Sequence, residues 1–204
     1  REPNYSMIGN LAVECRMPLC YGGGVKTVEQ LERIISLGVE KVAISSGIID
    51  NPDLIAKAAT VVGSQSIVVV MDARKSGRGC KYEIYTHNAR KATGKSPVEF
   101  AKQVADMGAG EVVINSVDRD GVMKGYDFDL INAVRQVINL PMTVLGGAGS
   151  LKDIAALLHR FGIIGAAAGS LFVFKGIYRA VLINYPNRSE KDSLIDHSRA
   201  VYEA

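Results

Sequence analysis

Short apolar runs alternate with amphipathic stretches along most of the chain. Runs such as SIVVVM at 66–71 and EVVINSV at 111–117 have the length and β-branched content of buried strands. Between such runs, apolar residues recur at helical spacing. The pattern predicts strands at 17–21, 41–45, 66–71, 111–117, 141–145 and 163–168, and helices at 4–15, 27–37, 51–62, 96–107, 127–138, 150–160 and 171–183.

This alternation is typical of βα units, which build one parallel sheet with helices packed on it. We expect a single α/β domain over residues 1–204, a (β/α)8 barrel of which about six βα units are present. The two missing units would be N-terminal. The segment 73–94 is too long for a simple βα loop, and KYEIYTH within it alternates as a hairpin strand does. Residues 185–204 are a polar C-terminal tail without an obvious core face.

Two stretches of the chain, 18–47 and 141–170, repeat one another. Each reads as a strand, a glycine turn, a helix and a second strand that ends in small residues, and such repeats indicate a barrel with pseudo-symmetry. Thr27 and Ser150 are the predicted N-caps of the two helices, and Gln30 completes a capping box with Thr27. The matching small residues are Gly23, Gly24, Ser45 and Ser46 in the first copy and Gly146, Gly147, Gly169 and Ser170 in the second.

The repeated glycines point to two sites for one chemical group. Without Cβ atoms, backbone N–H groups at a helix N-terminus can approach an anion closely, so phosphate is the expected ligand. The alternative is that these glycines only form tight turns. The repetition, with small residues on both neighbouring strands, favours phosphate.

Acidic residues end two of the predicted strands. Asp72 closes VVVMD and Asp118 closes VINSVD, so both are expected at the barrel mouth. A carboxylate partly shielded from water suits general acid–base catalysis, which makes Asp72 the candidate catalytic residue. The alternative is an ion pair with a basic neighbour such as Arg74. For Asp118 the ion pair carries more weight, and Asp120 in the turn DRDG can instead bind its own backbone.

Two charged residues begin strands at the opposite end of the sheet. Lys41 opens the strand 41–45 and Glu111 opens the strand 111–117. Charges at this end of a barrel are usually structural, but these two could instead gate an internal channel. The three histidines have no metal-ligand spacing, so no metal site is predicted.

Composition narrows the class of protein. The net charge is +3 with both signs interspersed, which argues against a nucleic-acid partner. The odd number of cysteines, three, indicates a reducing setting, so we expect a cytoplasmic protein. No apolar run approaches the ~20 residues that a membrane span needs, so no membrane is expected.

Several of these segments resemble the cyclase subunit of imidazole glycerol phosphate synthase. They are PLCYGGGVKTVEQLERIISLGVEKVAISSGIIDNPDLI, GSQSIVVVMDARK, GAGEVVINSVDRDGVMKGYD, LPMTVLGGAGS and AAAGSLFVF. The resemblance covers about residues 1–182, and order and spacing agree across all six predicted strands. It implies a (β/α)8 barrel with half-barrel pseudo-symmetry, and an enzyme of histidine biosynthesis without metal or organic cofactor.

The resemblance also implies the reaction. A glutaminase subunit, the glutamine amidotransferase partner, delivers ammonia through the barrel. The cyclase uses it to convert a bis-phosphorylated ribulosyl intermediate into imidazole glycerol phosphate and an aminoimidazole carboxamide ribotide. By resemblance, Asp72 is the catalytic Asp at the end of strand five, and Asp120 supports the substrate. Gly24, Ser45 and Ser46 bind one phosphate, Gly121, Gly147, Gly169 and Ser170 bind the other, and Lys41 and Glu111 belong to the charged ring at the ammonia entrance.

The chain departs from the family pattern at two places. Ser45-Ser46 stands where the family commonly has Asn-Thr. The family's first two βα units, which carry the other catalytic Asp and a loop-one Lys, have no counterpart here. We therefore expect the sequence to be part of a longer chain, with roughly 58 residues before residue 1 by comparison with an eight-unit barrel.

The amino-acid sequences of two segments leave open which branch of the family the protein belongs to. MPLCYGGG and KGIYRAVLINYP are more similar to the branch of this family tied to surface-polysaccharide sugars. Members of that branch work beside an amidotransferase to amidate or acetamidino-modify a nucleotide-linked sugar, and their barrel would chiefly conduct ammonia. A third hypothesis is a catalytically silent binding half of an amidotransferase complex.

Overall fold

The protein is built around a parallel β-sheet, as seen in a computed structural model that describes residues 2–77, 82–176 and 178–202. Within these residues the strand order is β1-β2-β3-β6-β7-β8, and every pair of neighbours is parallel. The strands are β1 (Cys20–Gly22), β2 (Lys41–Ile44), β3 (Ile67–Arg74), β6 (Glu111–Ser116), β7 (Met142–Leu145) and β8 (Gly165–Ala166). The predicted α/β fold with a parallel sheet is confirmed.

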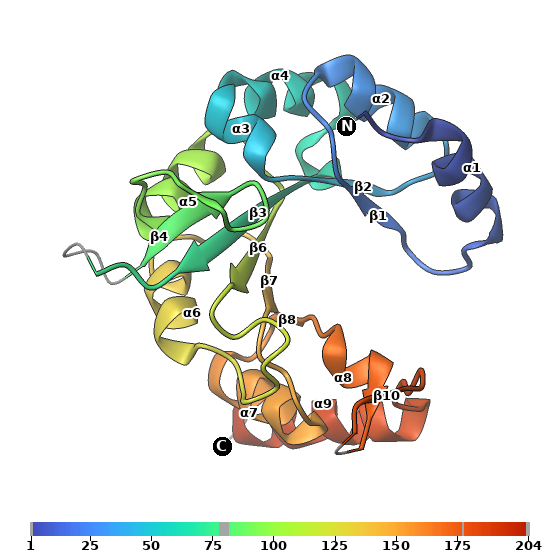
Figure 1. The fold of residues 1–204 in the computed structure, drawn as a ribbon, viewed down its shortest axis with the longest axis vertical. Coiled ribbons are helices and arrows are strands. Elements are labelled where there is room, and N and C mark those ends of the chain that lie inside the picture. The colour runs from blue at the N-terminus through green and yellow to red at the C-terminus, as the bar shows by residue number, and fades with distance from the viewer. Residues whose placement is uncertain (1, 78–81, 177, 203–204) are drawn as a thin grey trace.

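The sheet curves into an arc with helices along its convex side (Figure 1). β1 and β8 are the ends of the strand order and lie at the two sides of the arc's opening, as expected for the segments 17–21 and 163–168. A curved parallel sheet covered by helices is the arrangement of part of a (β/α)8 barrel. That two further N-terminal units complete it stays a prediction.

Helices connect the strands and bury the convex face. The predicted capping box of Thr27 and Gln30 is present, and the predicted N-cap Ser150 forms a second capping box with Asp153. In each, the cap hydroxyl accepts from the backbone N–H of the third helical residue at 3.3 Å. The helices are α1 (Tyr5–Glu14), α2 (Val28–Ser36), α3 (Ser46–Asp50), α4 (Asp53–Val62), α5 (Pro97–Asp106), α6 (Phe128–Arg135) and α7 (Leu151–Phe161), with a 3-10 turn η1 (Ser64–Ser66) before β3.

Side chains alternate between the two faces of the sheet. On β2, β3 and β6 the fully buried positions that form the core with the helices are Val42, Ile44, Val69, Met71, Val112 and Ile114. The intervening positions face the concave side. Lys41 and Glu111 form an ion pair although β3 lies between their strands, so both side chains are on this concave face. Alternation along β3 and β6 then places Asp72 and Asn115 on the same face, at the carboxyl ends of the strands.

The segment after β8 does not form the single helix predicted for 171–183. It forms the short helix α8 (Ser170–Val173) and then a hairpin of β9 (Phe174–Lys175) and β10 (Ala180–Val181). Gly176 has φ +73° and Arg179 has φ +49°, left-handed conformations that interrupt a helix. Apolar content alone cannot separate a buried helix from a strand pair, which is why the prediction was wrong.

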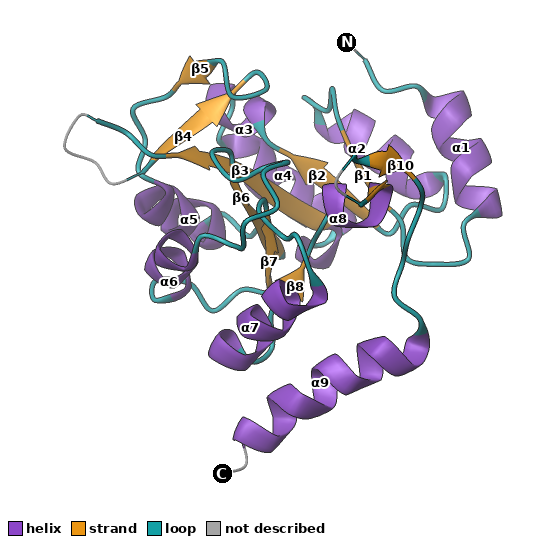
Figure 2. Cartoon of the chain, turned by 60° about the horizontal axis from the view of Figure 1, so that its bottom comes forward, coloured by secondary structure: helices purple, strands orange, loops and turns teal. Residues whose placement is uncertain are grey.

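Two other segments add to the expected fold. The hairpin predicted within 73–94 is present: β4 (Glu83–Thr86) pairs antiparallel with the end of β3 and with β5 (Lys91–Ala92). Residues 78–81 of this segment, with Cys80, lie outside the described residues. Part of the polar tail forms the helix α9 (Arg188–Tyr202), which lies against α7 (Figure 2). Leu194 packs against the core there, so a helix of low average hydrophobicity still has an apolar contact.

Candidate functional site

The two glycine turns of the repeat lie at the carboxyl ends of β1 and β7 and have similar backbones. We call residues 23–24 the first glycine turn and residues 146–147 the second glycine turn. Gly23 and Gly24 have φ of +129° and +74°, and Gly146 and Gly147 have φ of +91° and +115°. These values favour glycine over any residue with a Cβ. Each turn leads into a helix with a capping box, so the pseudo-symmetry seen in the sequence holds in the backbone.

The first glycine turn is close to the end of β2. A Cβ on Gly47 would lie 2.7 Å from the Val25 carbonyl oxygen, so the start of α3 packs against the loop that follows Gly24. Ser45 precedes α3 and does not cap it with its side chain. The structure therefore brings Gly24, Ser45 and Ser46 into one region, with a hydroxyl and helix N–H groups near the turn.

The second glycine turn is enclosed by the loop after β6. The Gly125 N–H donates to the Gly147 carbonyl oxygen at a distance of 2.8 Å, and a Cβ on Gly147 would clash with the Gly125 carbonyl. Gly121, in the same loop, lies opposite Ser170: its Cβ would be 3.9 Å from Ser170 Oγ. Gly169 precedes α8 with open space around it. The predicted residues of the second site thus also gather in one region.

Asp72 lies between these two regions, near the end of β3. Asn115, its register partner on β6, donates from Nδ2 to Asp72 Oδ1 over 2.9 Å. Arg74, which was weighed as an ion-pair partner for Asp72, binds Asp118 instead, with Nε 3.0 Å from Oδ1. The Lys75 backbone N–H also donates to Asp118, over 2.9 Å. Asp118 therefore has the structural role that the sequence left open, and it joins the loops after β3 and β6.

The turn DRDG is closed by its backbone. The Arg119 and Asp120 N–H groups each donate to the Ser116 carbonyl oxygen over 3.0 Å. The alternative considered for Asp120 was that its side chain binds the backbone of this turn, and the turn is instead closed by backbone hydrogen bonds. Arg179 Nη2 donates to the Gly121 carbonyl oxygen over 2.8 Å, so the hairpin after α8 is tied to this turn.

Lys41 and Glu111 meet at the amino ends of the strands. Lys41 Nζ is 2.6 Å from Glu111 Oε2, and the Thr143 hydroxyl donates to Glu111 Oε1 over 2.7 Å. The Glu111 side chain is only 16% exposed and that of Lys41 is 42% exposed. Desolvation and the nearby Glu111 carboxylate raise the pKa of the Cys20 thiol. Glu111 is thus largely shielded from solvent at this end of the concave face, opposite to Asp72, while Lys41 is partly exposed.

Sequence reasoning missed two features at the strand ends. One is Asn115, which is 8% exposed and has a period-2 relation to Glu111 that could have placed it on the concave face. The other is a buried network around Asp127, the N-cap of α6. The Tyr82 hydroxyl donates to Asp127 Oδ1 over 2.8 Å, and Arg119 Nε is 3.7 Å from Oδ2. Burial and the Asp127 hydrogen bond raise the pKa of Tyr82.

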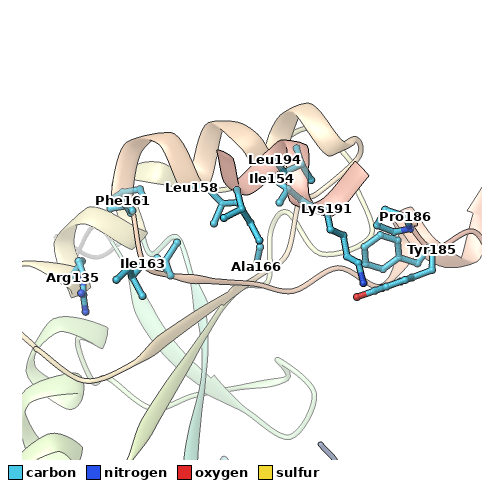
Figure 3. Close-up of a pocket in the computed structure, with 14 residues that line it drawn as sticks. Arg135, Ile154, Leu158, Phe161, Ile163, Ala166, Tyr185, Pro186, Lys191 and Leu194 are labelled. Carbon is cyan, nitrogen blue, oxygen red and sulfur yellow. The ribbon is translucent and has the colours of Figure 1, made fainter. Parts of the chain in front are cut away.

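The structure contains a cavity beside the candidate site residues and another away from them. One of about 400 Å³ opens beside the end of β3 and is lined in part by Tyr85, the antiparallel partner of Asp72. Another of about 770 Å³ lies between α7, β8 and α9 (Figure 3). Its lining includes Leu158, Phe161 and Leu194 and none of the predicted site residues. An apolar wall offers few groups for phosphate or acid–base chemistry, so we place the candidate site at the strand ends.

In residues 2–77, 82–176 and 178–202, no three His, Cys, Asp or Glu side chains gather as metal ligands would. Among the same residues, no helix is both long and apolar enough to cross a membrane.

The sequence matches known proteins over nearly its whole length. Residues 1–178 match the family described as "Histidine biosynthesis protein". A Leptospira interrogans protein named "Putative imidazole glycerol phosphate synthase subunit HisF" is 53% identical over 194 residues, 95% of this chain and 76% of that protein. Proteins named "Imidazole glycerol phosphate synthase subunit HisF" from Hyphomonas neptunium and Petrotoga mobilis are 42% and 39% identical. They match 82% and 86% of this chain and 66% and 69% of their own lengths. These matches confirm the resemblance to the cyclase subunit of imidazole glycerol phosphate synthase, and the chain belongs to the histidine biosynthesis protein family.

Proposed function

We propose that this protein is the ammonia-using cyclase subunit of an imidazole glycerol phosphate synthase. The observation that carries the proposal is the order of groups along the carboxyl ends of the strands. The first glycine turn lies at the end of β1, next to β2, Asp72 lies on β3 in the middle, and the second glycine turn lies at the end of β7, next to β8. A substrate with a phosphate at each end, bound to both turns, would place its central atoms over the Asp72 carboxylate.

Each turn has the groups that a phosphate needs. Positive-φ glycines let backbone N–H groups approach the oxygens, and Ser46 and Ser170 begin the short helices that follow β2 and β8. A phosphate site after the last strands, with a short extra helix, is frequent in barrels of this type. Asp72 would take up and return protons at the reacting centre, since a carboxylate held by one hydrogen bond keeps its other oxygen for substrate.

The concave face supports a route for ammonia. Between the Lys41–Glu111 pair and Asp72, the positions that alternation places on this face are the small or apolar Ala43, Val68, Val70 and Val113. Uncharged ammonia passes such a lining more easily than ammonium, because desolvating an ion is costly. We propose that a glutaminase subunit docks at the amino-terminal face beside Lys41 and Glu111 and supplies the ammonia there.

The decisive experiment replaces Asp72. In the full-length protein, Asp72→Asn should lower ammonia-driven turnover of the bis-phosphorylated ribulosyl substrate about 10²–10⁴-fold, the usual contribution of a general acid–base group. The matched control is Asp106→Asn, an exposed carboxylate at the end of α5 on the other side of the sheet. Unchanged turnover in the Asp72 variant, with folding intact, would reject the assignment.

The partner and channel have a separate test. Glu111→Ala should lower glutamine-driven turnover while sparing turnover with added ammonium salt, because the substitution opens the charged pair without touching the strand ends. Glu40→Ala removes an exposed neighbouring carboxylate and serves as the control. Equal losses with both nitrogen sources would mean that the Lys41–Glu111 pair is only structural.

A second candidate function is favoured by two segments of the sequence. MPLCYGGG and KGIYRAVLINYP are more similar to the branch of the family tied to surface-polysaccharide sugars. In that branch the barrel would chiefly conduct ammonia, beside an amidotransferase, for the modification of a nucleotide-linked sugar. Ammonia-driven turnover of the bis-phosphorylated substrate separates the hypotheses, since neither this branch nor a silent binding subunit would show it.

A further inference from the structure

One buried polar atom at the strand ends lacks a partner. Asn115 Oδ1 is buried and accepts no hydrogen bond from any residue that the structure describes, and the residue as a whole is only 8% exposed. Buried side-chain oxygens in folded proteins nearly always have a partner, because leaving one unpaired costs free energy. An exception beside a candidate catalytic carboxylate therefore points to a ligand that completes it.

The orientation of the amide follows from Asp72. The Asn115 nitrogen is 2.9 Å from Asp72 Oδ1, and a carboxylate oxygen can only accept. Exchanging the amide's nitrogen and oxygen would set two acceptors against each other, so Nδ2 must face Asp72. Oδ1 then faces the other way, toward Gly146: a Cβ on that glycine would lie 2.9 Å from it. The free acceptor thus lies between Asp72 and the second glycine turn.

The position of Asn115 along the strand identifies the donor. Glu111, Val113 and Asn115 occupy successive concave-face positions of β6, from the charged pair at one end to Asp72 at the other. Anything that travels along this face from the amino end reaches Asn115 and Asp72 together. A neutral amide oxygen suits a neutral N–H donor, because it binds the donor without taking its proton.

We propose that Asn115 binds the incoming ammonia through Oδ1 while Nδ2 orients Asp72. Ammonia has three N–H donors and one lone pair. A hydrogen bond to Asn115 fixes the nitrogen beside Asp72 and leaves the lone pair free for the substrate. This inference rests on the proposed function, since it assumes that ammonia reacts at this end of the sheet.

A matched pair of variants tests it. Thr and Val have the same shape, but only the Thr hydroxyl can donate to Asp72 and also accept from ammonia. In the full-length protein with ammonium chloride at fixed pH, Asn115→Val should raise KM for ammonia roughly five- to tenfold, as expected for one lost hydrogen bond. Asn115→Thr should stay within about threefold of the wild type for the same reason. KM for the bis-phosphorylated substrate should not change in either variant.

The outcomes separate this inference from the proposed function. If Asn115→Val lowers kcat and leaves KM for ammonia unchanged, Asn115 only positions Asp72 and the ammonia site is rejected. If wild-type protein shows no turnover with ammonium chloride, the proposed function fails and this inference falls with it. Asn139→Val, an exposed amide in the turn before β7, is the control. Should Asn115→Val not fold, Asn115→Ala and Asn115→Ser repeat the comparison with smaller side chains.

Discussion

The two copies of the repeat share a backbone but differ in what surrounds it. Gly23 and Gly146 are equivalent positions with φ of +129° and +91°. A Cβ on Gly23 would meet only the Tyr21 hydroxyl, at 3.9 Å, whereas a Cβ on Gly146 would lie 2.5 Å from the Ser116 carbonyl oxygen. The first glycine turn follows the edge strand β1, whereas the second follows β7, which has a neighbour on each side, and is covered by the loop after β6. Glycine is thus required in the first copy by conformation, and in the second by conformation and by packing.

The strand ends show the opposite distribution. Gly47, after β2, is crowded by the Val25 carbonyl oxygen and aligns with Ser170, while Gly169, which aligns with Ser46, has open space around it. Close backbone approaches are therefore made by the strand-end glycine in the first copy and by the turn glycines in the second. Pseudo-symmetry preserves the turn conformation, and the neighbouring loops decide which glycine can tolerate a side chain.

The largest expected difference between the copies is in stability. Gly23→Ala should cost about 1–2 kcal/mol for a side chain in the left-handed region. Gly146→Ala adds overpacking against Ser116, typically worth ~1–3 kcal/mol, so its total should be about 2–5 kcal/mol. Urea unfolding of the two variants measures both free energies. Equal losses would show that the surrounding loop relaxes and that packing does not distinguish the copies.

The helix caps should behave alike in both copies. Thr27→Ala and Ser150→Ala each remove one side of a capping box and should cost about 1 kcal/mol, measured by the same unfolding method. The hydrogen bonds from the N3 backbone to the cap have the same length in both, 3.3 Å. A cost confined to one helix would break the pseudo-symmetry at the level of local structure.

A further effect appears only at high pH, beside the second copy. Tyr126 donates from its hydroxyl to the Ala167 carbonyl oxygen over 3.0 Å, and burial, with the Asp153 charge, raises the pKa of Tyr126 to about 12. The unfolded pKa is about 10, so the folded state holds this proton more tightly. The contribution of Tyr126 is complete below pH ~10 and is lost as the pH rises toward ~12.

This pH dependence is measured by unfolding at several alkaline pH values. Tyr126→Phe should flatten the decline in stability relative to the wild type, leaving the part due to Tyr82. Tyr178→Phe, at a side chain that is 90% exposed, should leave the decline as it is. An identical decline in the Tyr126 and Tyr178 variants would show that the pKa of Tyr126 does not shift on folding.

Much of the fold could be predicted because its signals are local. Apolar runs bounded by glycine turns placed the parallel strands in order, and the hydroxyl residues Thr27 and Ser150 marked where helices begin. The hairpin after β3 followed from alternation in KYEIYTH. The segment 171–183 was wrong because its apolar residues fit a helix or a strand pair equally, and the left-handed backbone at Gly176 decided between them.

The pairings at the candidate site depended on tertiary structure. Asp72 and Arg74 lie two residues apart on β3, so strand alternation puts them on the same face, yet Asn115 binds Asp72 and Arg74 binds Asp118 in the turn after β6. Lys41 meets Glu111 across an intervening strand because the sheet curves, and the register of β3 against β6 sets Asn115 beside Asp72. By itself the sequence determined which residues stand at each strand end, since the bounds of the strands follow from local pattern. Only register and curvature, which are collective properties of the packed sheet, decided which of those residues meet.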